Sequence, residues 1–287
     1  MKLRLEVQMK NAVVYVSDFN DRRFLFQSMA SLRAFDKDIP VFVVVDSTDV
    51  DFNTSRLLKK YNASLVEISP FIRGKTSVLK LDPRRRWRRN VLYRLFIPYM
   101  EQLKDFDRVL YVDTDTIFFK DFKFLFDLEY SHFYGLFYQK SHTVPYERQR
   151  HLYNTLGNAY EYARRNCPHI ELRHPVPYYN SGVVMFNNGA IRRDIEKWNA
   201  IIDEYMRVFD CKIFPQYDQL FLNIFSRFDE YASNEWDVNT TTFGDKTVIG
   251  HFYGTNSMRI QRLLLMKARL SVHNPQLFKV LCDSSIP

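Results

Sequence analysis

The stretch of sequence that decides the fold reads A-V-V-Y-V-S-D-F-N and occupies positions 12–20. Its first five residues are all apolar and three of them are valine, a composition typical of a strand buried on both faces. The four residues that follow favour turns and helix caps. We therefore expect a buried strand over residues 12–16 that ends in a turn.

The same alternation of strand and helix continues after this stretch. Residues 22–34 carry apolar side chains at helical spacing, residues 41–45 form a second apolar run, residues 52–60 favour a helix, and residues 65–68 favour a third strand. Strands that alternate with helices predict an α/β fold with a mostly parallel central sheet flanked by helices. Because ligands bind beyond the carboxyl ends of such strands, Asp18 and Asp46 are candidate site residues.

The rest of the chain follows this pattern less regularly. Residues 70–90 are expected to form a loop that contains the basic run Arg84–Arg89, and residues 91–104 a helix that Pro98 can kink. Strands are expected at 109–112 and 182–186, and helices at 147–165, 190–207 and 216–226. No linker or repeat interrupts the pattern, so we expect one domain over residues 1–287, built from two closely packed halves.

The composition narrows the class of partner. The 287 residues include 41 Lys and Arg against 33 Asp and Glu, a net charge of +8, which suits a nucleotide, a nucleic acid, a membrane surface or an acidic glycan. The three cysteines, Cys167, Cys211 and Cys282, lack the spacing of a zinc site or a disulfide framework. With no apolar signal core or membrane span, the sequence predicts a cytoplasmic protein, and peripheral contact with a membrane stays an open alternative.

Asp113-Thr114-Asp115 directly follows one apolar run and precedes another. Side chains two residues apart on an extended segment point to the same side, so the two carboxylates are expected to converge. A divalent cation would relieve their repulsion, and both Mg²⁺ and Mn²⁺ prefer oxygen ligands. The tripeptide alone is common in turns and helix caps, but apolar sequence on both sides favours a buried site.

His251 is a further candidate ligand. It lies in the sequence G-H-F-Y-G at positions 250–254, after the apolar pair Val248-Ile249. A neutral imidazole is a good ligand for Mn²⁺, and Gly254 would let backbone amides approach a phosphate. A lone histidine is more often structural, so His251 is a candidate metal ligand only in combination with the two carboxylates.

Six short motifs extend this pattern along most of the chain. They are A-V-V-Y-V-S-D-F-N at 12–20, Y-R-L-F-I-P at 93–98, L-Y-V-D-T-D at 110–115, N-S-G-V at 180–183, Y-D-Q at 217–219 and H-F-Y-G at 251–254. In this order the motifs resemble those of the retaining GT-A glycosyltransferases of family 8, the glycogenin and lipopolysaccharide galactosyltransferase type.

The resemblance implies a fold and an activity. The fold would be GT-A, a single Rossmann-like domain with a nucleotide-binding half at 1–120 and a smaller acceptor-side half at 121–287 that supplies the metal-binding histidine. The activity would be retaining transfer of a sugar from a nucleotide-sugar, for which we expect a UDP-sugar, to a hydroxyl of a glycan or glycoconjugate. The cofactor would be Mn²⁺, with Mg²⁺ as the alternative. The oligomeric state stays open.

The resemblance also implies roles for individual residues. The implied metal ligands are Asp113, Asp115 and His251. The implied donor-binding residues are Asp18, Asn20, Arg94, Asp113, Thr114 and Gly254. The implied catalytic residues, near the anomeric carbon, are Asp218, Gln219 and Asn180. Helix capping by Asp218 and Gln219, and a tight turn at Asn180, are the competing interpretations.

One departure concerns the donor phosphates. The family usually continues its histidine motif with a lysine, whereas this chain has Ser257 at that position. Arg259 or an arginine of the 84–89 run would have to substitute.

Three other functions compete with sugar transfer. The Arg84–Arg89 run with Trp87 would suit a protein that binds nucleic acid or an acidic glycan. No zinc, RNP or helix-turn-helix pattern accompanies this run, so we expect no nucleic-acid partner. A nucleotidyltransferase would share the sheet and the paired carboxylates, but no glycine precedes Gly74 to form its phosphate loop. A catalytically inactive member of the fold is the third alternative.

Overall fold

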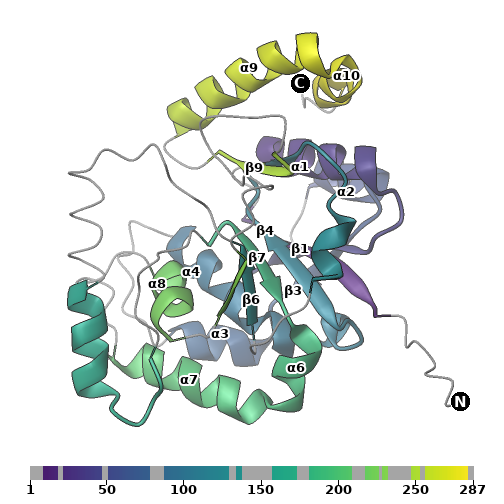
Figure 1. Cartoon of the computed structure of the whole chain (residues 1–287). Coiled ribbons are helices and arrows are strands. Elements are labelled where there is room, and N and C mark those ends of the chain that lie inside the picture. The colour runs from purple at the N-terminus through teal and green to yellow at the C-terminus, as the bar shows by residue number, and fades with distance from the viewer. Residues whose placement is uncertain are drawn as a thin grey trace, which may run out of the picture.

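The central sheet is built around the first apolar run. The computed structural model describes residues 9–18, 22–46, 51–77, 87–128, 134–137, 157–172, 181–208, 217–225, 228–231, 247–252 and 256–283. Within these residues, seven strands pair in the order β3-β2-β1-β4-β7-β6-β8 (Figure 1). Their bounds are Asn11–Val16 (β1), Val41–Val45 (β2), Ala63–Glu67 (β3), Arg108–Val112 (β4), Tyr134–Phe137 (β6), Val183–Phe186 (β7) and Phe228–Tyr231 (β8).

Strands β3, β2, β1 and β4 are parallel to one another, which confirms the mostly parallel α/β architecture. Beyond them β7 runs antiparallel to β4, β6 antiparallel to β7, and β8 parallel to β6. The chain goes outward from β1 to β2 and β3 and then returns to β4 on the other side of β1. Such a reversal leaves a crevice at the carboxyl ends of β1 and β4, where α/β sheets bind ligands.

The sheet is covered on both faces, which explains why its strands β1, β2 and β7 are continuously apolar. Val13 and Tyr15 of β1 pack with helix α1 (Arg22–Phe35) on one face. Ala12 and Val14 of the same strand pack on the opposite face with the 3₁₀ helix η1 (Tyr93–Tyr99) and with helices α7 (Ile195–Val208) and α8 (Tyr217–Ile224).

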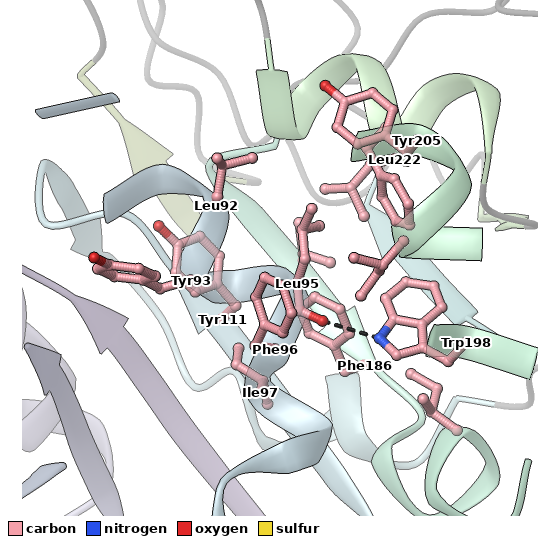
Figure 2. Packing of buried hydrophobic residues seen from close by; sticks show 14 of the residues in the cluster. Leu92, Tyr93, Leu95, Phe96, Ile97, Tyr111, Phe186, Trp198, Tyr205 and Leu222 are labelled. Carbon is pink, nitrogen blue, oxygen red and sulfur yellow. Dashed lines mark hydrogen bonds between the residues drawn. The ribbon is translucent and has the colours of Figure 1, made fainter. Parts of the chain in front are cut away.

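Pro98 turns the expected helix over 91–104 into two 3₁₀ helices, η1 and η2 (Glu101–Leu103), which follow α4 (Trp87–Leu92). Proline has no N–H, so a carbonyl one turn earlier loses its intrahelical donor. The carbonyl of Leu95 accepts instead from the indole Nε1 of Trp198 at 2.9 Å, in the centre of the core (Figure 2). The missing backbone bond is therefore replaced by a link to α7.

The prediction of a continuous loop over 70–90 is wrong. Residues Pro70–Ser77 form helix α3, and Trp87–Leu92 form α4. The sequence does contain the signal, since Ser69 caps the helix through a bond from the Ile72 N–H to its Oγ at 3.4 Å, and Pro70 is the first helical residue. Residues 78–86 lie outside the described part of the chain.

The remaining helices agree with the sequence pattern in outline. Helix α2 (Phe52–Lys60) begins after Asp51, whose Oδ1 accepts from the Thr54 N–H at 2.8 Å. The helix expected over 190–207 is divided at Asp194 into α6 (Asn188–Arg193) and α7. Of the helix expected over 147–165, the described residues begin at 157 and are helical to 166.

A second, two-stranded sheet lies at the carboxyl end of β4. It pairs β5 (Thr116–Phe118) antiparallel with β9 (Ile249–His251). Helices α9 (Asn256–His273) and α10 (Pro275–Asp283) follow and pack on α1 through a third apolar cluster that includes Phe24 and Met266. Among the described helices, none combines the length and the apolarity that crossing a membrane requires.

Candidate functional site

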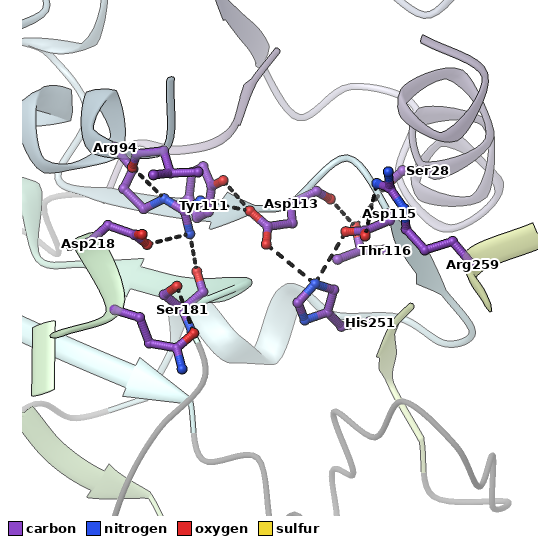
Figure 3. Close-up of polar contacts among 12 residues, drawn as sticks. Ser28, Arg94, Tyr111, Asp113, Asp115, Thr116, Ser181, Asp218, His251 and Arg259 are labelled. Atoms are coloured by element: carbon purple, nitrogen blue, oxygen red, sulfur yellow. Dashed lines mark hydrogen bonds and ion pairs between the residues drawn. The ribbon is translucent and has the colours of Figure 1, made fainter. Parts of the chain in front are cut away.

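Asp113, Asp115 and His251 converge at the carboxyl end of β4 (Figure 3). The Nε2 atom of His251 lies 3.3 Å from Oδ2 of Asp113 and 3.2 Å from Oδ1 of Asp115. One ligand atom from each residue falls within 4.8 Å of the other two. Two carboxylates and one imidazole fit the preferences of Mn²⁺, and the oxygen ligands also suit Mg²⁺.

The two carboxylates converge through a turn and not along an extended strand as expected. Strand β4 ends at Val112, and residues 114–115 turn the chain before β5 begins at Thr116. The turn is fixed by the Thr116 hydroxyl, which donates to the Asp113 carbonyl at 2.8 Å. On its other side the Phe252 N–H donates to the Asp115 carbonyl at 2.8 Å, so the end of β9 is tied to the acidic turn.

A chain of buried hydroxyls supports this turn from below. The Tyr15 hydroxyl lies 2.9 Å from Ser28 Oγ, which lies 2.8 Å from Thr116 Oγ1. These residues come from β1, α1 and β5, so three elements fix the position of the Thr116 side chain. Buried hydroxyls that pair with one another restrict the side chains to one arrangement, because an unpaired partner would lose the free energy of its hydrogen bond.

Gly182 leaves the space that the His251 imidazole occupies. A Cβ atom at position 182 would lie 2.8 Å from Nε2 of His251 and closer still to Cε1 and Nδ1. The Gly182 carbonyl accepts from the Asp113 N–H at 2.7 Å. The backbone of Gly182 therefore contacts both Asp113 and the imidazole of His251.

Arg94 holds the opposite side of the cluster. Its guanidinium is buried and donates to Oδ1 of Asp113 at 3.0 Å, to the Ser181 carbonyl at 2.5 Å and to the Val91 carbonyl at 3.0 Å. Oδ2 of Asp218 lies 3.2 Å from its Nη1. Tyr111 lies beneath, with its ring 4.2 Å from the Arg94 Cζ and its hydroxyl bonded to Asp113.

Asp218 and Gln219 reach the site from the first turn of α8. Asp218 is buried against Arg94, and Oε1 of Gln219 lies 3.3 Å from the Ser181 hydroxyl. Burial raises the pKa of Asp218 above its ordinary value, although the charge of Arg94 opposes the rise. Both side chains thus face the site, whether or not they also cap the start of the helix.

Arg259 approaches the cluster from the first turns of α9. Its Nη1 lies 3.3 Å from Oδ2 of Asp115, and its Cζ lies 4.9 Å from the centre of the Phe24 ring. Two arginines therefore flank the acidic pair, Arg94 on Asp113 and Arg259 on Asp115, while His251 lies between the two carboxylates (Figure 3).

The electrostatics of the cluster favour a charged imidazole when no cation is bound. Burial disfavours the imidazolium, but the carboxylates of Asp115 and Asp113 outweigh it and raise the pKa of His251 from 6.5 to about 9. Burial likewise opposes ionisation of Asp113, but Arg94 and His251 hold its pKa well below the usual range. A metal ion would therefore have to displace a proton from His251 at neutral pH.

We expect the stability of the metal-free protein to fall between pH 6.5 and 9. The folded-state pKa of His251 is raised, so its contribution is complete below pH 6.5 and is lost as the pH rises through about 9. That contribution is on the order of 3 kcal/mol in the free energy of unfolding. Urea unfolding in EDTA at a series of pH values measures it.

The control for this experiment is His273→Gln, which changes an exposed histidine at the end of α9. This variant should keep the pH dependence of the wild type, whereas His251→Gln should lose most of it. Equal slopes in His251→Gln and the wild type would contradict the assignment of the charge to His251.

Several expected residues lie apart from the cluster or outside the described residues. Asp18 is exposed just after β1, and Thr114 is half-buried in the acidic turn. Asp46 pairs with Arg73 at 3.0 Å. Asn20, Asn180, Gly254 and the arginines at 84–86 lie outside the described residues, so their proposed roles stay predictions.

Tyr111, Ser181 and Gly182 are site residues that the sequence did not single out. Each lies inside a motif that was recognised for its neighbours, Tyr111 before the acidic pair and Ser181 and Gly182 within N-S-G-V. Ser181 acts through its carbonyl, and Gly182 through its lack of a side chain. Neither property gives a signal in a single sequence.

Comparisons with known proteins give a family and a fold for the chain. The model of glycosyl transferase family 8 matches residues 12–256. No curated protein matches the chain. The galactosyltransferase LgtC in complex with donor and acceptor sugar analogues has a TM-score of 0.59 at 17% identity, over 90% of this chain and 95% of that one. An active-site mutant of LgtC gives 0.58 at 18% identity, with the same two coverages.

The bifunctional glycosyltransferase WbbM gives a TM-score of 0.55 at 16% identity, over 91% of this chain and 50% of that one. The chain thus spans half the length of WbbM. At these identities the likeness shows the fold, and it confirms the GT-A architecture.

Proposed function

The chain belongs to glycosyl transferase family 8, and we propose that it transfers a sugar, with retention, from a UDP-sugar to a hydroxyl of a glycan or glycoconjugate. The observation that carries the proposal is the convergence of Asp113, Asp115 and His251 at the carboxyl end of β4, next to the point where the strand order reverses. Family membership makes the protein a glycosyltransferase; the donor, the acceptor, the metal and the stereochemistry are our proposal.

We propose that Asp113, Asp115 and His251 hold Mn²⁺, with Mg²⁺ as the alternative. The bound cation would stabilise the negative charge that develops on the leaving diphosphate. Without a cation, three carboxylates are balanced by Arg94, Arg259 and the protonated His251. Exchange of the His251 proton for a divalent cation leaves an excess of positive charge, which favours binding of a diphosphate.

Arg94 serves in this proposal to hold the carboxylates. Its guanidinium already contacts Asp113, Asp218 and two backbone carbonyls, and only 3% of the residue is exposed. Its positive charge keeps Asp113 ionised and so able to bind a cation. Any contact of Arg94 with the donor would be secondary to this role.

Asp218, Gln219 and Asn180 are proposed to lie near the anomeric carbon of the donor. The contacts of Asp218 with Arg94 and of Gln219 with Ser181 support this for two of the three, because both side chains face the acidic cluster. The sequence pattern does not identify a catalytic nucleophile. We therefore propose a front-face reaction, in which the leaving phosphate accepts the proton of the acceptor hydroxyl. Asp18, Asn20, Thr114 and Gly254 would complete the donor site.

Arg259 is proposed to supply the cation that Ser257 lacks. Replacement of Arg259 by Gln should raise the KM for the donor by about tenfold or more, because a charged hydrogen bond to the diphosphate is lost. Steady-state kinetics at saturating Mn²⁺ measures the change. Arg164→Gln, which alters an exposed arginine paired with Glu161, is the matched control and should leave KM unchanged. An unchanged KM in Arg259→Gln would exclude this role.

Calorimetric titration tests the proposed function. UDP, GDP, dTDP and CMP are each titrated in Mn²⁺ and in EDTA, and we expect selective binding of UDP that requires Mn²⁺. Failure of every nucleotide to bind would overturn the proposal. Turnover of a panel of UDP-sugars then separates an active enzyme from an inactive one. Release of UDP indicates sugar transfer, whereas release of sugar 1-phosphate from the same UDP-sugars would indicate nucleotidyl transfer.

A further inference from the structure

Helix α9 carries most of the large apolar side chains that are exposed in the described part of the chain. Among the described residues, six large apolar side chains are exposed, and four of the six lie on α9. They are Met258, Leu264, Leu265 and Val272, with exposed fractions from 40% to 74%. Figure 1 shows α9 and α10 at one end of the molecule, beyond α1. Concentration of such side chains on one outer helix indicates a docking surface.

The spacing of three of these residues places them in a row along the helix. Met258, Leu265 and Val272 are seven residues apart, and residues at this spacing lie along one side of a helix with a drift of only about 20° per step. The row extends for about 21 Å at 1.5 Å per residue. Leu263, Met266 and Leu270 lie on the other side of α9 and are buried against the rest of the protein. The helix is thus apolar on two opposite sides.

The charged residues of α9 are all basic. Residues 256–273 contain Arg259, Arg262, Lys267 and Arg269 and no Asp or Glu. Arg262 and Arg269 are themselves seven residues apart, and each falls four residues after a member of the apolar row, so a basic row runs beside the apolar one. Arg269 is exposed.

We propose that α9 docks the protein on an anionic lipid surface. A helix that lies in a membrane interface places apolar side chains among the acyl chains and Lys or Arg among the headgroups, and α9 offers both on its outer side. Pairing of α9 with α9 of a second copy would bring two basic rows together with no acidic residue on either helix to offset them. Charge complementarity therefore favours lipid over self-association.

Docking through α9 would also place the candidate site beside the lipid surface. The same helix contributes Arg259, which contacts Asp115 at 3.3 Å. An acceptor that carries its sugar on a lipid anchor could then reach the site without leaving the membrane. This last consequence rests on the proposed function, whereas the docking itself does not.

Vesicle co-sedimentation of the full chain tests the proposal without any measurement of activity. Vesicles of phosphatidylcholine are compared with an equal mixture of phosphatidylcholine and phosphatidylglycerol, at low and high salt. We expect binding to the mixed vesicles that weakens with salt. Leu265→Ser/Val272→Ser should reduce it by at least about tenfold. Arg269→Gln should reduce it by about fivefold, the equivalent of one cation at an anionic surface.

Two control variants change the same residue types elsewhere. Met9→Ser/Phe71→Ser removes the other two large apolar side chains that are exposed among the described residues, and Arg164→Gln removes an exposed arginine on the 157–166 helix. Both should bind vesicles like the wild type. Loss of binding in all variants alike, or no binding of the wild type, would overturn the proposal. So would light scattering that shows a wild-type dimer which Leu265→Ser/Val272→Ser converts to a monomer.

Discussion

Replacement of Asp115 by Asn is expected to lower the rate of sugar transfer by at least about a thousandfold, the scale of losing a preorganised charge in a buried site. Asp115 is buried, and its carboxylate contacts both His251 and Arg259. Asn keeps the shape of the side chain but not its charge, so the substitution removes a proposed cation ligand with little change in packing. Initial rates across a range of Mn²⁺ concentrations measure the effect.

The matched control is Asp105→Asn, which changes an exposed carboxylate just before β4 and should behave as the wild type. Circular dichroism of both variants should show the wild-type fold, so that a loss of rate reports on chemistry and not on folding. If Asp115→Asn kept the full metal-dependent rate, the assignment of the metal site would be wrong.

Replacement of Gly182 by Ala is expected to weaken Mn²⁺ binding by about 10- to 100-fold, as for changes to the residues that support metal ligands. The new methyl group would overlap the His251 imidazole, with its carbon 2.8 Å from Nε2 and nearer to two other ring atoms. His251 would have to move away from the carboxylates. The backbone at Gly182 lies outside the left-handed region, so the effect belongs to the side chain. Mn²⁺ titration by calorimetry measures it.

Gly74→Ala serves as the control, because a Cβ at Gly74 in α3 would meet no atom within 4 Å. Alanine favours a helix interior by about 1 kcal/mol over glycine, so this variant should be slightly more stable and bind Mn²⁺ normally. Wild-type Mn²⁺ affinity in Gly182→Ala would show that His251 is not a ligand, or that it binds from another position.

The sequence predicts the frame of the fold well because the signals are local. The buried strand over 12–16 and the strands over 41–45 and 109–112 follow from unbroken apolar runs, and β1, β2 and β4 confirm them within one residue. The loop predicted over 70–90 overlooks helix α3, although Ser69 and Pro70 are local signals for the start of a helix. The sequence also predicts the break at Pro98. It does not predict the hydrogen bond that replaces the missing one, because Trp198 donates to the carbonyl of Leu95 from 103 positions away.

The candidate site was only partly predictable for the same reason. The residues that carry charge, Asp113, Asp115, His251 and Asp218, stand out in the sequence and meet in the structure. The features that fix their geometry are contacts between residues far apart in the sequence, and the residues involved have no charge. They include the space at Gly182 and the hydroxyls of Ser28 and Thr116, which are 88 positions apart. Such contacts depend on the complete fold and leave no local pattern.

The order in which the chain supplies this centre has a consequence for its synthesis. The acidic turn precedes β9 and α9 by a long interval, and Asp115 and Arg259 are 144 positions apart. A nascent or truncated chain that ends before β9 would present the paired carboxylates without the histidine or the second arginine. The centre is thus completed only when nearly the whole chain has folded, and an unfinished copy would lack two of its charged groups.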